Sequence, residues 1–213
     1  MKKLLNLLIV VLVVFSICTE TYLFVIKGMH PLILNETSYL SRFIFYYSYF
    51  TVLSNLAVGL SCLILLVNAD YSAKWFKVLR LDSIVCITIT CIVYNGMMRQ
   101  WHDVDGMVIL TNEFLHLIIP ILTIFSWLIY GPRQFIDQQV MSIAVIPPLI
   151  YVFYIFIRGY LTHIYPYHFL NADQLGLSKA LWIIAALIIL FLLLEFILFL
   201  IDNKLACGAE KRR

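Results

Sequence analysis

The longest apolar run of the sequence lies between Lys179 and Asp202 and carries a single charged residue, Glu195. A helix rises 1.5 Å per residue and the hydrocarbon core of a bilayer is about 30 Å thick, so about 20 apolar residues cross it. A helix that is apolar on every side is typical of a membrane span or of the core of a large protein. In a chain of 213 residues, this run favours a helical membrane protein.

Applied to the whole chain, the same criterion predicts six helices. They cover about residues 4–26, 44–67, 82–98, 109–130, 140–158 and 180–201. Composition agrees, because 63% of the residues are hydrophobic and only 13% are charged, a balance far from that of soluble proteins. The connections are too short to fold into a soluble core. We therefore predict an all-α integral membrane protein with one domain, a six-helix bundle over residues 1–213.

Lysine and arginine are more frequent in the cytoplasmic loops of membrane proteins. With the N-terminus inside, ten of the fifteen Lys and Arg residues fall in inner segments and five (15 − 10) in outer ones. This asymmetry predicts that both termini are cytoplasmic, in a multi-pass protein of the cell membrane, expected to be a bacterial plasma membrane. The net charge of +3 follows from the same asymmetry, so a nucleic-acid partner is not expected.

The cysteines show no pattern of a disulfide framework or of a metal site. None of the five forms a CxxC pair or has the spacing of metal ligands, and four lie within predicted helices, where cysteine is usually a small hydrophobic residue. The five are Cys18, Cys62, Cys86, Cys91 and Cys207. We predict no disulfide, no metal and no cofactor.

Polar residues recur at helical spacing inside two of the predicted helices. In the second helix Ser48, Thr51 and Asn55 follow one another at steps of three and four, and in the fourth helix Asn112 and His116 are four residues apart. Such steps place side chains on one face of a helix. Polar residues retained within spans usually face the interior of the bundle, so we predict that these two faces are directed inward and can share a layer.

Thr51 and His116 lie at the same predicted depth. Each is seven residues from the outer end of its helix (51 − 44 and 116 − 109), or about 10 Å below the outer boundary. A hydroxyl beside an imidazole is the minimum for nucleophilic catalysis, with threonine as nucleophile and histidine as base. Candidates for binding substrate or stabilising an oxyanion are Ser48, Asn55, Asn95, Asn112, Tyr154 and Tyr165.

Other interpretations of the same residues remain open at this point. A threonine in a spanning helix most often bonds the carbonyl four residues before it, and polar residues also bind helices to one another. The faces can equally line a cavity that binds or transports a lipid or small molecule without cleaving it. The aromatic loop 159–179 is either an interfacial belt or a cap over a site that opens outward.

Four segments carry a resemblance to a known family. They read YFTVLSN at 49–55, NEFLHLIIP at 112–120, and PPLIYVFYIFIRG followed by YPYHFLN within 147–171. Together they resemble the prokaryotic six-pass membrane proteins related to the androgen-induced and androgen-dependent TFPI-regulating proteins. The similarity extends from about residue 45 to 175, and the motif YPY-x-F-L is its most specific part.

The resemblance implies an activity and two catalytic residues. The eukaryotic relatives are six-pass hydrolases of fatty acid esters of hydroxy fatty acids that use an intramembrane threonine and histidine. Their threonine lies in a Y-x-T-x-x-N context, which Tyr49, Thr51 and, shifted by one residue, Asn55 match; their histidine follows an asparagine, as His116 follows Asn112. The resemblance therefore implies an ester hydrolase that acts on a membrane lipid or fatty-acyl ester.

Overall fold

The computed structural model describes residues 1–34, 36–101 and 106–210, and within these ranges the chain is predominantly helical and contains no strand. The first half comprises α1 (Lys2–Glu20), η1 (Thr21–Ile26), η2 (Pro31–Ile33), α2 (Tyr39–Tyr46), α3 (Phe50–Val67), α4 (Lys74–Val93), η3 (Tyr94–Met98) and η4 (Arg99–Trp101). The second half comprises α5 (Met107–Glu113), η5 (Phe114–Ile118), α6 (Ile119–Tyr130), α7 (Gln138–Ala144), α8 (Ile146–Thr162), η6 (His168–Leu170), α9 (Ala172–Leu175) and α10 (Leu177–Glu210). Residues 211–213, three of the ten basic residues counted as inner, lie outside the described part.

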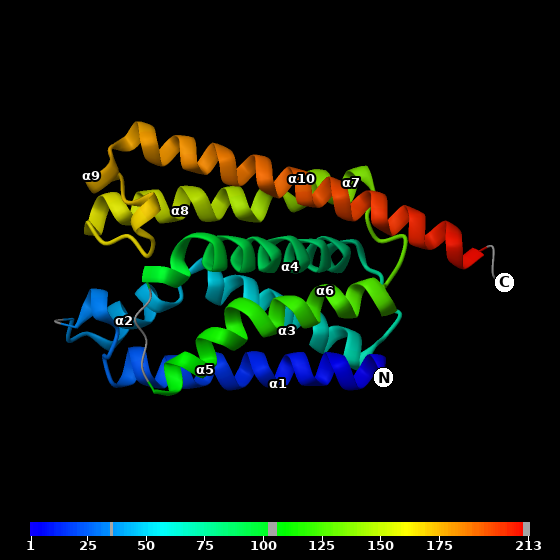
Figure 1. Ribbon diagram of the computed structural model, residues 1–213, viewed down its shortest axis with the longest axis horizontal. Coiled ribbons are helices and arrows are strands. Elements are labelled where there is room, and N and C mark those ends of the chain that lie inside the picture. The colour runs from blue at the N-terminus through cyan, green and yellow to red at the C-terminus, as the bar shows by residue number, and fades with distance from the viewer. Residues whose placement is uncertain (35, 102–105, 211–213) are drawn as a thin grey trace.

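The long helices form a bundle with α4 in its middle (Figure 1). α4 packs against α3, α6, α7 and α10, while α1 packs against α3 and α6. The N-terminal end of α1 and the C-terminal end of α10 lie at the same end of the bundle, and α2 and α9 lie at the opposite end (Figure 1). The short helices α2 and α9 therefore lie away from the termini, whereas the short helix α7 lies nearer to them.

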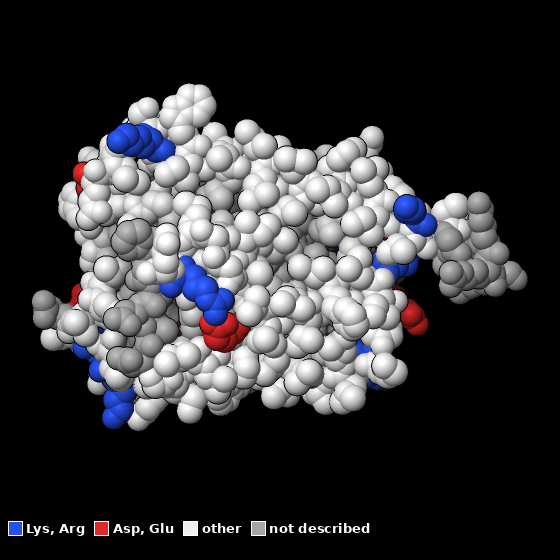
Figure 2. Space-filling model, in the orientation of Figure 1, with Lys and Arg blue, Asp and Glu red and all other residues white. Residues whose placement is uncertain are grey.

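Five helical segments are long and apolar enough to cross a membrane. They are Lys2–Ile33, Phe50–Val67, Met107–Tyr130, Gln138–Thr162 and Leu177–Cys207. On the face shown in Figure 2, charged side chains gather mainly at the two ends of the bundle and a broad uncharged surface lies between them. These features indicate a multi-pass membrane protein, as predicted from the sequence.

The central helix α4 differs from these five because its N-terminal half is charged. Its first nine residues include Lys74, Lys77, Arg80 and Asp82. Arg80 and Asp82 are only 2% and 7% exposed, so the surrounding helices cover them. Arg80 and Asp82 are thus shielded by protein, which is how charged residues are usually retained in a membrane bundle.

The predicted second helix, 44–67, is not continuous, and this corrects the sequence-based boundaries. α2 ends at Tyr46 and α3 begins at Phe50. The break is fixed at Ser48, whose hydroxyl lies 2.7 Å from that of Tyr154 and whose carbonyl accepts from Tyr151 at 3.0 Å. Thr51 therefore lies in the first turn of a new helix, rather than two turns into a long one.

The predicted fifth helix, 140–158, is likewise divided, because α7 ends at Ala144 and α8 begins at Ile146. Pro147 and Pro148 follow the division at once. Neither has an N–H to continue the hydrogen bonds of α7, so a local change of helix geometry is expected there.

Gly159 in α8 allows the following loop to fold back closely onto the helix. A Cβ atom at this position would lie 2.1 Å from the ring of Tyr165, which is buried. We expect Gly159→Ala to displace the ring and to lower the free energy of unfolding by about 1–3 kcal/mol, measured by thermal unfolding in detergent. Gly96→Ala is the control, because no heavy atom lies within 4 Å of its added Cβ; equal losses in both variants would contradict the argument.

Candidate active site

Thr51 lies in the first turn of α3, where backbone amides have no acceptor inside the helix. No side-chain cap from Tyr49 accepts from them. The Thr51 N–H instead donates to the hydroxyl of Tyr167, 3.3 Å away in the segment after α8. The Thr51 carbonyl accepts from the side-chain amide of Asn55 at 2.8 Å. Both the N–H and the carbonyl of Thr51 are thus held by hydrogen bonds to side chains.

His116 lies in the π-helical turn η5. Two features at this turn remove the α-helical hydrogen-bond donors of backbone carbonyls. The N–H of Ile119 bonds to the carbonyl of Phe114, five residues back, so the α-helical donor for the Leu115 carbonyl is absent. Pro120 has no N–H, which removes the α-helical donor for the His116 carbonyl. Buried carbonyls need other partners.

Two asparagines supply those partners. Asn55 Nδ2 donates to the Leu115 carbonyl at 3.2 Å, and Asn95 Nδ2 donates to the His116 carbonyl at 3.0 Å. The first bond comes from α3 and the second from η3, so both neighbouring helices hold the turn. Because Asn55 also bonds the Thr51 carbonyl, one side chain links the backbones that carry the hydroxyl and the imidazole.

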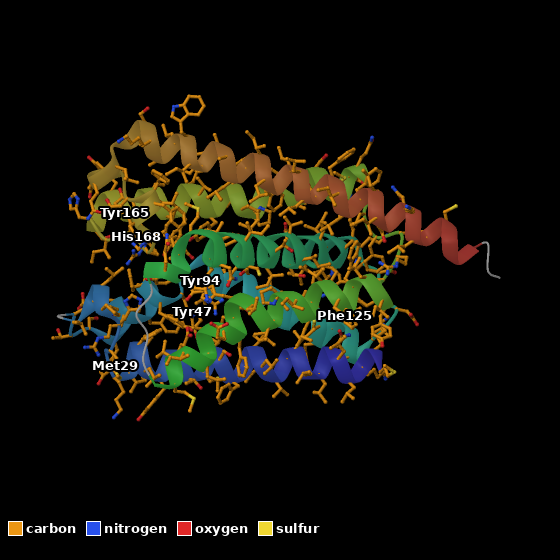
Figure 3. All side chains as sticks on the ribbon, viewed as in Figure 1. Met29, Tyr47, Tyr94, Phe125, Tyr165 and His168 are labelled. Atoms are coloured by element: carbon orange, nitrogen blue, oxygen red, sulfur yellow. The ribbon has the colours of Figure 1, made fainter. Side chains whose placement is uncertain are left out.

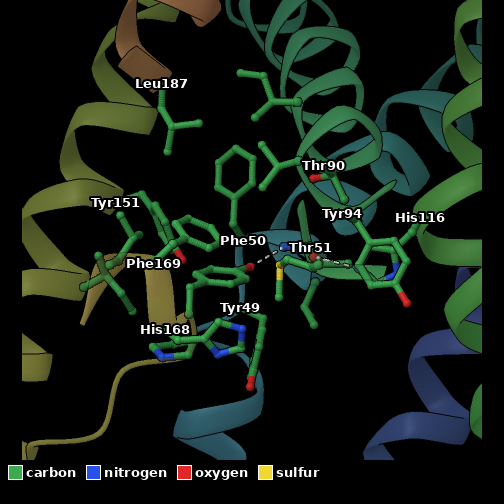
Figure 4. Close-up of a pocket in the computed structure, with 18 of the residues that line it drawn as sticks. Tyr49, Phe50, Thr51, Thr90, Tyr94, His116, Tyr151, His168, Phe169 and Leu187 are labelled. Carbon is green, nitrogen blue, oxygen red and sulfur yellow. Dashed lines mark hydrogen bonds between the residues drawn. The ribbon is translucent and has the colours of Figure 1, made fainter. Parts of the chain in front are cut away.

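The side chains of Thr51 and His116 are in contact, with Thr51 Oγ1 3.2 Å from His116 Nε2 (Figure 4). The other ring nitrogen, Nδ1, lies 3.0 Å from the backbone carbonyl of Asn112. A carbonyl only accepts, so Nδ1 carries the proton and Nε2 of the neutral ring carries a lone pair that accepts. The hydroxyl of Thr51 therefore donates to His116, as a nucleophile donates to its base.

The imidazole is also held through its face. The rings of Tyr94 and His116 are stacked, with centroids 3.8 Å apart and planes 23° from parallel. Tyr94 lies inside the bundle (Figure 3), and its hydroxyl accepts a hydrogen bond from Asn112 Nδ2. Asn112 therefore orients His116 twice, directly through its carbonyl and indirectly through Tyr94.

Thr51 and His116 open onto a cavity of about 580 Å³. Its polar lining includes Glu20, His30, Tyr49, Thr51, Thr90, Tyr94, Asn112, His116, Tyr151, Tyr167 and His168. Away from these residues the lining is apolar, and it includes Pro148, Leu149, Val152, Ile155 and Phe156 of α8 and Ile184, Leu187, Ile188 and Phe191 of α10. The reactive pair therefore lies in the same cavity as a long apolar surface (Figure 4).

Of the six residues predicted to bind substrate or stabilise an oxyanion, only Asn112 lines this cavity. The other five, Ser48, Asn55, Asn95, Tyr154 and Tyr165, are not among its lining residues in the described part of the chain. Asn55 and Asn95 hold backbone carbonyls, Ser48 and Tyr154 bond each other, and Tyr165 packs on Gly159. Spacing placed them on suitable helices, but their side chains are used between helices.

Tyr94 and Tyr167 contact His116 and Thr51, and sequence reasoning missed both. In the motif YPYHFLN the sequence-based candidate is Tyr165, whereas Tyr167 is the tyrosine that lines the cavity; both are buried. Tyr167 has extended backbone angles, φ −125° and ψ 125°. The motif offered a choice between two tyrosines, and no periodic signal in an irregular loop distinguishes them.

Among the residues that the structure describes, no group of three or more His, Cys, Asp or Glu side chains is placed to hold a metal ion. In comparisons with known proteins, no family model, no curated protein and no solved structure matches the chain.

Proposed function

We propose that this chain is an intramembrane carboxylic ester hydrolase, with Thr51 as nucleophile and His116 as base. The observation that carries the proposal is the 3.2 Å contact between Thr51 Oγ1 and His116 Nε2, on a ring whose other nitrogen is bonded to the Asn112 carbonyl. This is the arrangement of nucleophile, base and orienting group that acyl transfer requires. The resemblance of the four sequence segments to the threonine hydrolase family supports the same assignment.

The reaction proceeds in two halves. Thr51 Oγ1 forms a bond to the ester carbonyl carbon while its proton passes to His116 Nε2. The tetrahedral intermediate then breaks its bond to the alkoxy oxygen, which takes that proton and leaves as the alcohol, so the acyl group remains on Thr51. Water next attacks the acyl carbon and gives a proton to Nε2. Collapse releases the carboxylic acid, and Thr51 Oγ1 recovers its proton.

The apolar lining of the cavity favours a membrane-lipid or fatty-acyl ester as substrate. Ligand sites commonly enclose about 300–1,000 Å³ and place a few polar groups within apolar walls, and the cavity of about 580 Å³ lies in this range. In this assignment the acyl chain lies along α8 and α10, and the ester carbonyl lies at Thr51.

We further propose that α4 with η3 is the sixth span. Two termini at the same end of a bundle (Figure 1) require an even number of crossings, whereas five apolar segments are an odd number. With both termini cytoplasmic, as the Lys and Arg asymmetry favours, Thr51 lies in the outer half of a bacterial plasma membrane.

Binding or transport without bond cleavage is the second candidate function. Glu20, His30 and Tyr49 line the same cavity and have no step in the hydrolysis above. The Glu20 carboxyl lies 3.1 Å from the Tyr46 hydroxyl and 2.8 Å from that of Thr111. Such a polar surface favours recognition of a head group, whether or not the ligand is cleaved.

A fluorophosphonate carrying a long alkyl chain separates the two candidates. We expect the purified protein in detergent to form a covalent adduct, which peptide mass spectrometry locates on Thr51, and to release free acid from at least one ester in a panel of membrane lipids. A protein that lipids stabilise against thermal unfolding, with neither adduct nor product, would instead be a binding or transport protein.

A further inference from the structure

Tyr167 holds its hydroxyl directly in front of the first turn of α3. The Thr51 N–H donates to the hydroxyl oxygen at 3.3 Å, and the residue is 6% exposed and lines the cavity. Because this oxygen accepts from a backbone amide, the proton of the same hydroxyl points elsewhere. Tyr167 is therefore a donor located next to the proposed nucleophile.

The phenol keeps that proton at neutral pH. Burial raises the pKa of Tyr167 above its ordinary value; the Thr51 hydroxyl and the backbone amides of Thr51 and Phe50 oppose this shift, followed by Tyr151. The ordinary pKa of tyrosine is already about 10. A neutral phenol among these groups can donate a hydrogen bond and cannot act as a base.

The ring is fixed by its aromatic neighbours. It stacks with Phe169, with centroids 5.2 Å apart and planes at 23°, and meets Tyr49 edge-on at 5.4 Å. Tyr151, which lies beside it in the cavity lining, donates its own proton to the Ser48 carbonyl at 3.0 Å.

We propose that Tyr167 is a further catalytic residue, whose hydroxyl donates to the ester carbonyl oxygen as that oxygen becomes negative; this rests on the proposed hydrolysis by Thr51. In the tetrahedral intermediate the carbonyl carbon of the substrate is bonded to Thr51 Oγ1. The negatively charged oxygen on that carbon therefore lies next to Thr51, whose backbone N–H contacts the Tyr167 hydroxyl. The positive end of the α3 dipole acts on the same charge. A donor that is fixed before reaction stabilises an oxyanion without reorganising.

Tyr167→Phe tests the role because it keeps the ring and removes only the hydroxyl. We expect kcat for a fatty-acyl ester to fall about 100-fold, the usual loss for one oxyanion donor, with KM little changed. A long-chain trifluoromethyl ketone, which forms a hemiketal oxyanion on the nucleophile, should bind about 100-fold more weakly, whereas the affinity for the fatty-acid product should stay unchanged. Loss of packing alone would weaken both ligands and would overturn the proposal.

Tyr165→Phe is the matched control, since Tyr165 is a buried tyrosine two residues away that does not line the cavity, and it should retain wild-type kcat. The outcomes separate the two proposals. A hydrolase that requires Thr51 but retains wild-type kcat in Tyr167→Phe would overturn the role of Tyr167 alone. A wild-type protein without hydrolysis would overturn the function and, with it, this inference.

Discussion

Replacing Thr51 with alanine is expected to lower kcat/KM for ester hydrolysis by at least about 10⁴-fold, because removal of a nucleophile leaves only binding and oxyanion stabilisation. Thr51→Ser keeps an oxygen at the same position and should retain most of the activity. The measurement is release of fatty acid from the best substrate of the lipid panel. Thr51→Ala should also lose the fluorophosphonate adduct.

Thr88→Ala is the control for this change. Thr88 lies in α4, and its hydroxyl donates to the Ile84 carbonyl at 2.7 Å, which is the ordinary bond of a threonine within a helix. It should hydrolyse esters at the wild-type rate. Wild-type turnover in Thr51→Ala would rule out a nucleophilic role for Thr51, whatever the stability of the variant.

Replacing His116 with glutamine is expected to lower kcat about 10³-fold, within the usual contribution of a general base. Glutamine can still bond the Thr51 hydroxyl but cannot take its proton. The pH profile gives a second measurement. The wild-type rate should fall in acid as the imidazole gains a proton at Nε2, and the small residual rate of the variant should lose this dependence.

His163→Gln controls for removal of a histidine elsewhere. His163 is exposed and contacts Asp173, with 2.9 Å between Nδ1 and Oδ2, on the loop after α8. Its substitution should leave both the rate and the acid limb of the profile unchanged. If His163→Gln and His116→Gln altered the acid limb equally, the base would not be His116.

The sequence indicates the apolar helices and predicts that Thr51 and His116 form a pair, because both conclusions depend on patterns between residues close together in the chain. Apolar runs show where the chain can cross a membrane, and steps of three and four placed Thr51 and His116 on polar faces. The predicted depth of Thr51 requires a continuous helix from residue 44, whereas α3 begins only at Phe50. Local patterns give the face of a helix more reliably than its starting point.

The supporting contacts of the site were beyond reach from the sequence because each joins distant segments. The sequence predicts Asn55 and Asn95 as residues that bind substrate or stabilise an oxyanion. In the structure their side-chain amides donate to the carbonyls of Leu115 and His116. These two carbonyls need side-chain donors because the π turn and Pro120 remove their α-helical donors. Helical periodicity assumes a regular helix, so it does not predict which carbonyls an irregular turn leaves without a donor.

The π turn at Phe114–Ile118 makes the pocket depend on helix register. A π turn holds one residue more than an α-helical turn, so shortening it by one residue would restore a regular helix. Each residue of an α-helix turns the chain by about 100° and advances it 1.5 Å. Asn112 would then rotate by about 100° relative to Pro120 and leave the Tyr94 hydroxyl. The helix would be more regular, but the residues before and after the π turn could no longer contact their present partners at the same time.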